Sequence, residues 1–174
     1  GATVVYGTLA QRAPASAAAL GKLLEVAGWR VFDANLRAPH DGRDVALAAL
    51  GQADFVKLNE HELVSFAAWL GSEPEPDSLR SVLRREFGIR SLCVTEGARG
   101  ARLWHDGAVV VQPAQPTQIA DTIGAGDSFL AMLLTELLSG TAPAVAMRRA
   151  ARLASFVASR PGALPDYAAA QFRI

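Results

Sequence analysis

Short strand-like runs alternate with helical runs along most of this chain, and that alternation limits its fold more than any other feature. Strands that are each followed by a helix build parallel βαβ units, whereas a helical bundle or a β-sandwich would show only one of the two periodicities. The pattern therefore predicts an α/β fold with a mostly parallel sheet. The expected strands of this sheet are residues 3–6, 29–32, 55–58 and 91–94.

The remaining segments complete the expected order of elements. Residues 101–105 and 108–112 are two apolar runs separated by Asp106-Gly107, which is typical of an antiparallel hairpin. No repeat, low-complexity tract or linker interrupts the chain, so we expect residues 1–174 to form a single α/β domain. Helices are expected from about residue 14, over 43–50, up to about 70, up to about 87, over 127–139 and over 143–159.

The composition is that of a globular protein without a strong electrostatic field. The chain is 51% hydrophobic and carries seventeen charges of each sign, so its net charge is zero. A neutral surface does not favour nucleic acid or anionic lipid, and no apolar stretch nears the ~20 residues that cross a bilayer. Cys93 is the only cysteine and lies in an apolar run, which excludes an internal disulfide and fits a cytoplasmic protein.

The run from Asp121 to Phe129 joins a glycine-rich turn, a helix start and two carboxylates. Gly124, Ala125 and Gly126 can bring bare backbone close to a ligand, and the amides at a helix start attract phosphate. Asp127, in the first turn of that helix, is our candidate for a base that takes a proton from a substrate hydroxyl. An acidic residue there is also common for its favourable dipole interaction alone. Asp121 favours the functional interpretation, because capping needs only one of the two carboxylates.

Asn59 and Glu62 have two interpretations at the end of the third expected strand. An asparagine followed three residues later by glutamate is the pattern of a capping box, which needs no ligand. The same acid could instead orient Mg²⁺ through water, since this ion prefers few protein ligands. Both roles can coexist. Lys57, two residues earlier, could neutralise phosphate or could simply be solvated.

Two further polar clusters follow strand ends, where α/β sheets collect their ligands. Asp33, Asn35 and Arg37 alternate along a segment expected to be extended, so they would share a side and could hydrogen-bond phosphate or hydroxyl groups together. Residues 95–100 form a glycine-bounded turn, for which a structural role is favoured when it is taken alone. The P-loop pattern and the dinucleotide fingerprint are both absent from the chain.

Taken in order, these clusters resemble those of ribokinase-like sugar kinases, the PfkB carbohydrate kinase family, and are most similar to fructokinase-type members. The resemblance implies a three-layer α/β/α sandwich and transfer of the γ-phosphoryl group of ATP to a sugar hydroxyl. It implies that Asp127 is the catalytic base and contacts the substrate, as Arg37 would. The backbone of Gly124, Ala125 and Gly126 would form the anion hole.

The resemblance also implies a nucleotide and metal site. Asn59 and Glu62 would hold magnesium and phosphate, and Asn35 would lie near the phosphates. Residues 151–163 would line the adenine side, and some members need K⁺ at the Asp121 loop. Two departures from the family bear on cation dependence and base selectivity: Ile123 replaces a frequent threonine, and Ala151 stands where some members have asparagine. The residues that would border the nucleotide are Thr95, Gly97 and Gly100.

The family's N-terminal part, which carries most sugar contacts and the lid, has no counterpart here. We therefore expect this chain to be the nucleotide-binding C-terminal part of a larger kinase, with weak or no turnover alone, and allow for a homodimer of the full-length protein. Three alternatives stay open: a nucleoside, sugar acid or sugar phosphate as acceptor, a degenerate interaction module, or a lobe of an NAD-binding oxidoreductase. The missing dinucleotide fingerprint disfavours the last.

Overall fold

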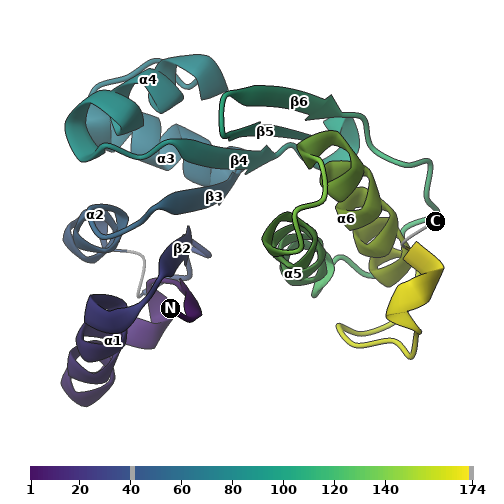
Figure 1. The fold of residues 1–174 in the computed structure, drawn as a ribbon, viewed down its shortest axis with the longest axis horizontal. Helices are drawn as coiled ribbons and strands as arrows, with labels where there is room; N and C mark the ends of the chain where they lie inside the picture. The colour runs from purple at the N-terminus through teal and green to yellow at the C-terminus, as the bar shows by residue number, and fades with distance from the viewer. Residues whose placement is uncertain (40–41, 173–174) are drawn as a thin grey trace. The chain divides into compact units, whose positions relative to one another are not determined.

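The computed structural model of the chain describes residues 1–39 and 42–172 (Figure 1). It divides into two compact units: Gly1–Val94, called the N-terminal unit below, and Thr95–Ile174, called the C-terminal unit. Its six strands are hydrogen-bonded in chain order, β1-β2-β3-β4-β5-β6, with parallel pairs at one end and an antiparallel pair at the other. The predicted α/β fold with a mostly parallel sheet and one antiparallel hairpin is confirmed.

The N-terminal unit is built on parallel strands whose carboxyl ends share one edge. Each strand begins where the sequence predicts, and three of the four continue one residue further than expected. Asp33 lies opposite Lys57 in the β2–β3 register, so the polar residues that end these two strands are neighbours. The strands are β1 (Thr3–Tyr6), β2 (Trp29–Asp33), β3 (Phe55–Asn59) and β4 (Ser91–Thr95).

The core of the N-terminal unit is aromatic and aliphatic. Phe32, Phe55 and Phe66 are fully buried, and the Phe32 and Phe66 rings meet edge to face at 6.1 Å between centroids. That contact fixes α3 on the strands, because Phe66 belongs to the helix and Phe32 to β2. The helices of this unit are α1 (Pro14–Val26), α2 (Arg43–Leu50), α3 (Glu60–Leu70) and α4 (Pro76–Phe87), and a short 3₁₀ helix, η1 (Leu9–Gln11), follows β1.

The C-terminal unit combines the hairpin with two helices that pack side by side, α5 (Ala125–Leu138) and α6 (Pro143–Ala158) (Figure 1). The hairpin strands, β5 (Ala101–His105) and β6 (Ala108–Gln112), have the predicted bounds. Asp106 and Gly107 both have positive φ, as a two-residue hairpin turn requires. Two 3₁₀ helices, η2 (Gly97–Arg99) and η3 (Ala169–Phe172), complete the unit.

The start of α5 differs from the sequence prediction. The helix begins at Ala125 instead of Asp127, because Gly124 takes a left-handed conformation at φ 79° and serves as its N-cap. Glycine adopts this conformation without steric cost. Ala125 and Gly126 are therefore the first two helical residues, and Asp127 is the third.

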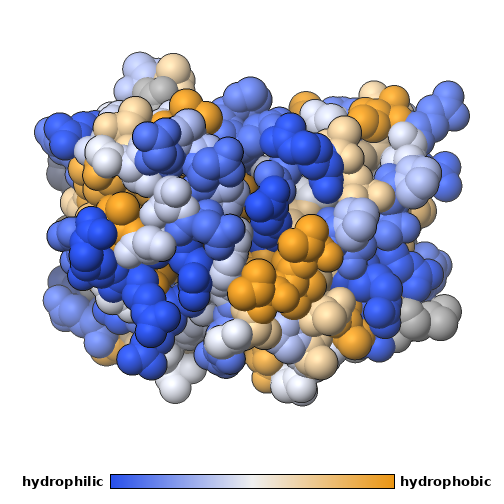
Figure 2. Space-filling view, turned by 90° about the horizontal axis from the view of Figure 1, so that it is seen from above, coloured by the Kyte–Doolittle hydropathy of each residue, from blue (hydrophilic) through white to orange (hydrophobic). Residues whose placement is uncertain are grey.

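The surface carries scattered apolar side chains, and Figure 2 shows a small apolar group on an otherwise mostly hydrophilic face. Val109 and Val111 of β6 are 62% and 64% exposed, as alternate residues on the outer side of a strand. Among the described residues, no helix combines the length and the hydropathy that a membrane span requires.

Candidate functional site

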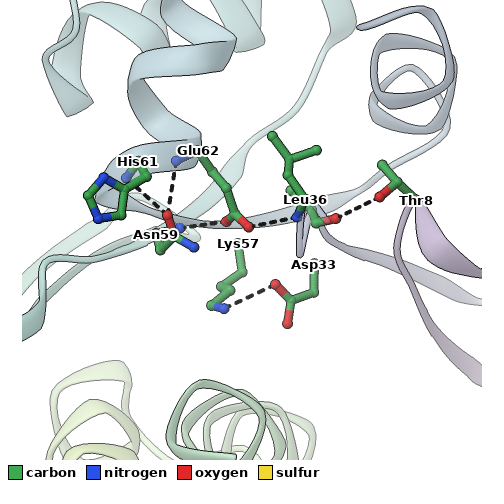
Figure 3. Close-up of polar contacts among 8 residues, drawn as sticks. Thr8, Asp33, Leu36, Lys57, Asn59, His61 and Glu62 are labelled. Atoms are coloured by element: carbon green, nitrogen blue, oxygen red, sulfur yellow. Dashed lines mark hydrogen bonds and ion pairs between the residues drawn. The ribbon is translucent and has the colours of Figure 1, made fainter. Parts of the chain in front are cut away.

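Glu62 of α3 is the centre of a hydrogen-bonded cluster that joins the end of β3 to the segment after β2 (Figure 3). The Glu62 carboxylate is 4% exposed and accepts two backbone hydrogen bonds. Its Oε2 accepts from the amide of Asn59 at 2.8 Å, and its Oε1 accepts from the amide of Leu36 at 3.0 Å. Glu62 thus joins the segment after β2 to the start of α3, a link across 26 residues of sequence.

Asn59 caps α3, as one of the two sequence interpretations predicts. Its Oδ1 accepts from the amides of His61 and Glu62, both at 2.9 Å, and together with the Glu62–Asn59 bond this completes a capping box. The capping interpretation is confirmed. The magnesium role of the same two residues stays a prediction.

Lys57 is neither solvated nor placed as a surface charge. Its Nζ lies 3.0 Å from Asp33 Oδ1, and the two side chains are only 7% and 10% exposed. Figure 3 draws this ion pair on the side of the strands away from α3. The neighbouring Cys93 is itself fully buried, and its burial raises the pKa of the thiol to about 12. The interpretation of Lys57 as a solvated residue was wrong, because its cross-strand partner lies 24 residues earlier in sequence.

The segment after β2 is not extended as predicted. β2 ends at Asp33, and Asn35 takes a left-handed backbone at φ 40°. The alternation that would have placed Asp33, Asn35 and Arg37 on one side therefore fails at Asn35. Asn35 is half-buried and Arg37 exposed, and their roles toward nucleotide and substrate stay predictions.

Sequence reasoning missed the contribution of the turn after β1. Thr8 is 1% exposed and its hydroxyl donates to the carbonyl oxygen of Ala34 at 3.3 Å. Gly7 approaches the same segment so closely that a Cβ would come within 2.6 Å of the Asp33 carbonyl oxygen. The glycine-threonine pair directly after a strand was the available signal. Three strand ends thus converge on residues 33–36.

The glycine-rich turn of the C-terminal unit is tied to the end of α6 and the chain that follows it. Asp121 Oδ1 accepts from the amide of Ile123 at 3.0 Å, and its Oδ2 accepts from the amide of Gly162 at 3.2 Å. A Cβ on Gly124 would lie 2.6 Å from the Ala163 carbonyl oxygen, so only glycine fits there. This scaffold leaves Asp127 exposed in the first turn of α5.

The second glycine turn, residues 95–100, is held by its own backbone. Gly100 has φ 101°, and a Cβ at this position would collide with the Gln112 carbonyl oxygen and the following residues. The Glu96 amide donates to the Gly100 carbonyl oxygen at 2.7 Å, while the buried Glu96 side chain pairs with Arg102 at 3.1 Å. The turn therefore has a full structural role, and the proximity of Thr95, Gly97 and Gly100 to a nucleotide stays a prediction.

A polar cavity of about 360 Å³ lies between α6 and the segment that follows β6. Phe172 forms part of its wall and packs against Phe156 of α6, with the two rings tilted and 5.4 Å apart between centroids. Four residues of the segment 151–163, expected to line the adenine side, also line this cavity, but their contact with adenine stays a prediction. Sequence reasoning missed the segment after β6 and Phe172, which carry no recognisable pattern. The lining residues are Gln115, Pro116, Thr117, Gln118, Arg152, Ser155, Phe156, Ser159 and Phe172.

Each unit thus assembles part of the predicted site. In the N-terminal unit, Glu62 is hydrogen-bonded to Asn59 and to the amide of Leu36, the residue that follows Asn35. Residues 124–127 lie beside residues 162–163 in the C-terminal unit. Within residues 1–39 and 42–172, no group of three or more His, Cys, Asp or Glu side chains is arranged to hold a metal ion.

Comparison with known proteins defines the class of this fold and site. The pattern of the pfkB family carbohydrate kinases matches residues 3–169, and the chain belongs to this family. It is 36% identical to a fructokinase of Klebsiella pneumoniae over 131 residues, which are 72% of this chain and 41% of the fructokinase. It is 31% identical to a 2-dehydro-3-deoxygalactonokinase of Haloferax volcanii over 128 residues, 69% of this chain and 39% of that enzyme.

The fold agrees with that of a solved sugar kinase. A crystal structure of the fructokinase of Vibrio cholerae O395, bound to fructose, ADP and calcium, superposes with a TM-score of 0.76 and 26% identity over 94% of this chain. The match covers 56% of that fructokinase. The chain therefore spans about two fifths to just over half of the length of these relatives. The resemblance to PfkB sugar kinases is confirmed.

Proposed function

We propose that this chain is the nucleotide-binding part of an ATP-dependent sugar kinase. The observation that carries the proposal is the exposed Asp127 in the first turn of α5, directly after the left-handed Gly124. A helix start provides amides without partners inside the helix, which suit a phosphate, and the carboxylate lies beside them. Family membership supports the reaction type.

The chemistry assigned to this turn is an in-line phosphoryl transfer. The acceptor hydroxyl oxygen forms a bond to the γ-phosphorus of ATP while the bond to the β–γ bridging oxygen breaks and ADP leaves. Asp127 accepts the hydroxyl proton, which raises the nucleophilicity of the oxygen. The amides of Gly124, Ala125 and Gly126 stabilise the charge on the transferred group. Arg37 is assigned to the acceptor.

Magnesium is assigned to Asn59 and Glu62, whose donors are oxygens, as this ion prefers. Both carboxylate oxygens of Glu62 already accept backbone amides, so water-mediated binding fits the donor set better than direct ligation. Bound magnesium would neutralise phosphate charge. We assign Asn35 to the phosphates, Thr95, Gly97 and Gly100 to the nucleotide border, and the cavity beside α6 to the adenosine end. Potassium is assigned to the Asp121 loop.

The acceptor is proposed to be a hexose such as fructose, on the strength of the two fructokinase relatives. A sugar acid is the second candidate, because the Haloferax relative is named as a kinase of 2-dehydro-3-deoxygalactonate and is 31% identical. For the whole protein we propose the cytoplasm as its location and a homodimer as its assembly. This chain alone is proposed to give weak or no turnover.

A coupled assay of ADP release tests the proposal, with fructose, ribose, a sugar acid and a nucleoside as acceptors. The whole protein and the 174-residue chain are compared, each beside Asp127→Asn. We expect turnover by the whole protein, a loss of roughly 10²–10⁴-fold in kcat for Asp127→Asn, and little turnover by the chain alone. Robust sugar phosphorylation by this chain would contradict its assignment as a part. Full activity of Asp127→Asn would contradict its role as base.

A further inference from the structure

We propose that Glu62 is a positioning residue whose two backbone hydrogen bonds, called the Glu62 clamp below, hold the Asn35 turn in its left-handed conformation and thereby raise nucleotide affinity even without magnesium. The inference rests on the proposed nucleotide site. It assigns to Glu62 a task that precedes any contact with metal, because both carboxylate oxygens are hydrogen-bonded to backbone amides.

The turn is fixed on both sides of Asn35. On one side, the Ala34 carbonyl oxygen accepts a hydrogen bond from the buried Thr8 hydroxyl at 3.3 Å. On the other side, the Leu36 amide donates to Glu62 at 3.0 Å. A non-glycine residue at φ 40° persists only where its surroundings determine its conformation, and asparagine tolerates it best. Loss of the Glu62 bond would free one side of the turn.

The strand ends behind the turn are held together, so Glu62 connects two segments whose positions are fixed relative to each other. The buried Asp33–Lys57 pair joins β2 to β3 directly before the two segments that Glu62 connects. Asn59 fixes Glu62 at the start of α3, because the Asn59 side chain caps this helix and the Asn59 amide donates to the Glu62 carboxylate. Glu62 therefore connects the segment that carries Asn35, assigned to the phosphates, with Asn59, assigned to magnesium.

The two hydrogen bonds of Glu62 depend on the position and number of its acceptor oxygens more than on its charge. Two amides bind one carboxylate through different oxygens, so geometry and acceptor number decide the fit. Glu62→Gln keeps the size but places an NH₂ group opposite one amide, and Glu62→Asp keeps the charge but shortens the reach. Both changes should break at least one bond, whereas a metal-binding role would tolerate Asp better than Gln.

Glu60→Gln is the matched control. Glu60 is also an acidic residue in the first turn of α3, so the substitution removes the same charge at the same helix end. It leaves both amide bonds of Glu62 in place. Any effect of the helix dipole is therefore shared between the control and Glu62→Gln.

Amide hydrogen exchange of the 174-residue chain measures directly whether the Leu36 and Asn59 amides are hydrogen-bonded to Glu62. We expect Glu62→Gln and Glu62→Asp to lower protection of the Leu36 or Asn59 amide by about tenfold or more, while the Val31 and Val56 amides of the sheet keep theirs. Glu60→Gln should leave all four unchanged. Unchanged protection at Leu36 and Asn59 in both Glu62 variants would overturn the proposal.

Calorimetric titration with ADP, in Mg²⁺ and in EDTA, measures the effect of these variants on nucleotide affinity. We expect both Glu62 variants to raise the Kd for ADP in EDTA by about fivefold to tenfold, and by at least as much in Mg²⁺. A loss confined to the Mg²⁺ titration would overturn the proposal in favour of a metal ligand. A wild-type chain that binds no ADP would count against the nucleotide site itself, while the exchange experiment would still decide on the clamp.

Discussion

Lys57 and Asp33 form an ion pair of 3.0 Å between adjacent parallel strands, with both side chains nine-tenths buried or more. Two charges out of water contribute little as a pair, but either one left alone is strongly unfavourable. The pair also lies directly before the segments that carry Asn35 and Asn59. It therefore makes the geometry of the candidate phosphate site dependent on the correct pairing of β2 with β3.

Lys57→Met should destabilise the chain by about 3–5 kcal/mol, because it leaves the Asp33 carboxylate buried without its cation. Urea unfolding followed by circular dichroism measures this loss. Arg30→Ala is the matched control, since its pair with Asp54 is over a third exposed and should be worth at most about 1 kcal/mol. Equal losses for the two variants would show that the Lys57–Asp33 pair is hydrated in solution.

Tyr6 makes the chain sensitive to alkaline pH. Burial raises the pKa of this phenol to about 12 from 10.0, and its hydroxyl donates to the Ala49 carbonyl oxygen at 2.9 Å. The folded state thus holds the proton more tightly than the unfolded state, so the contribution of Tyr6 to stability is complete below pH 10 and is lost as the pH rises toward 12.

Tyr6→Phe should remove this dependence and cost about 1 kcal/mol at pH 7 through the lost hydrogen bond. Urea unfolding at pH 7, 10 and 11.5 compares the two proteins. We expect the advantage of the native protein over Tyr6→Phe to fall as the pH rises and to reverse by pH 11.5, because the raised pKa of Tyr6 then costs more than the hydrogen bond contributes. A difference that stays constant across this range would contradict the raised pKa of Tyr6.

Gly124→Ala should be more damaging than an alanine at another left-handed glycine. Gly124 and Gly140 have nearly equal φ, 79° and 76°, but a Cβ meets the Ala163 carbonyl oxygen at 2.6 Å only at Gly124 and has open space at Gly140. Gly140→Ala should cost about 1 kcal/mol from backbone strain, and Gly124→Ala should cost about 1–3 kcal/mol more from the collision. Thermal unfolding measures both. Equal melting temperatures would mean that the Ala163 segment moves away from the turn.

Ser155→Trp should obstruct the cavity beside α6 and weaken ADP binding without unfolding the chain. Ser155 lines the cavity of about 360 Å³, so an indole at this position would project into it. Arg148→Trp, an exposed position on the same helix, is the control and should bind ADP normally. Calorimetry with Mg-ADP checks both variants. Normal binding by Ser155→Trp would place the adenosine end elsewhere.

The strands and helices could be predicted because periodicity reports which side of an element is buried. The bounds of β1, β5 and β6 match the prediction. The helix α5 begins two residues before its predicted start, because Gly124 caps it. The capping box at Asn59 and Glu62 was readable because it depends on residues three apart.

The parts of the candidate site that the sequence did not predict depend on contacts between distant residues. The left-handed Asn35 follows from bonds made by Thr8 and Glu62, each 26 residues away from its partner. The burial of Lys57 depends on Asp33 on the neighbouring strand. The role of Phe172 in the cavity depends on its stacking with Phe156, and no local pattern predicts such a contact.

Titration of the 174-residue chain with Mg-ADP and with NADH, by calorimetry, tests the central claim most directly. The account predicts saturable binding of Mg-ADP, weakened by Asn59→Ala and by Ser155→Trp, and no binding of NADH. A folded chain that binds neither ligand, or that prefers NADH, would contradict its assignment as the nucleotide-binding part of a sugar kinase.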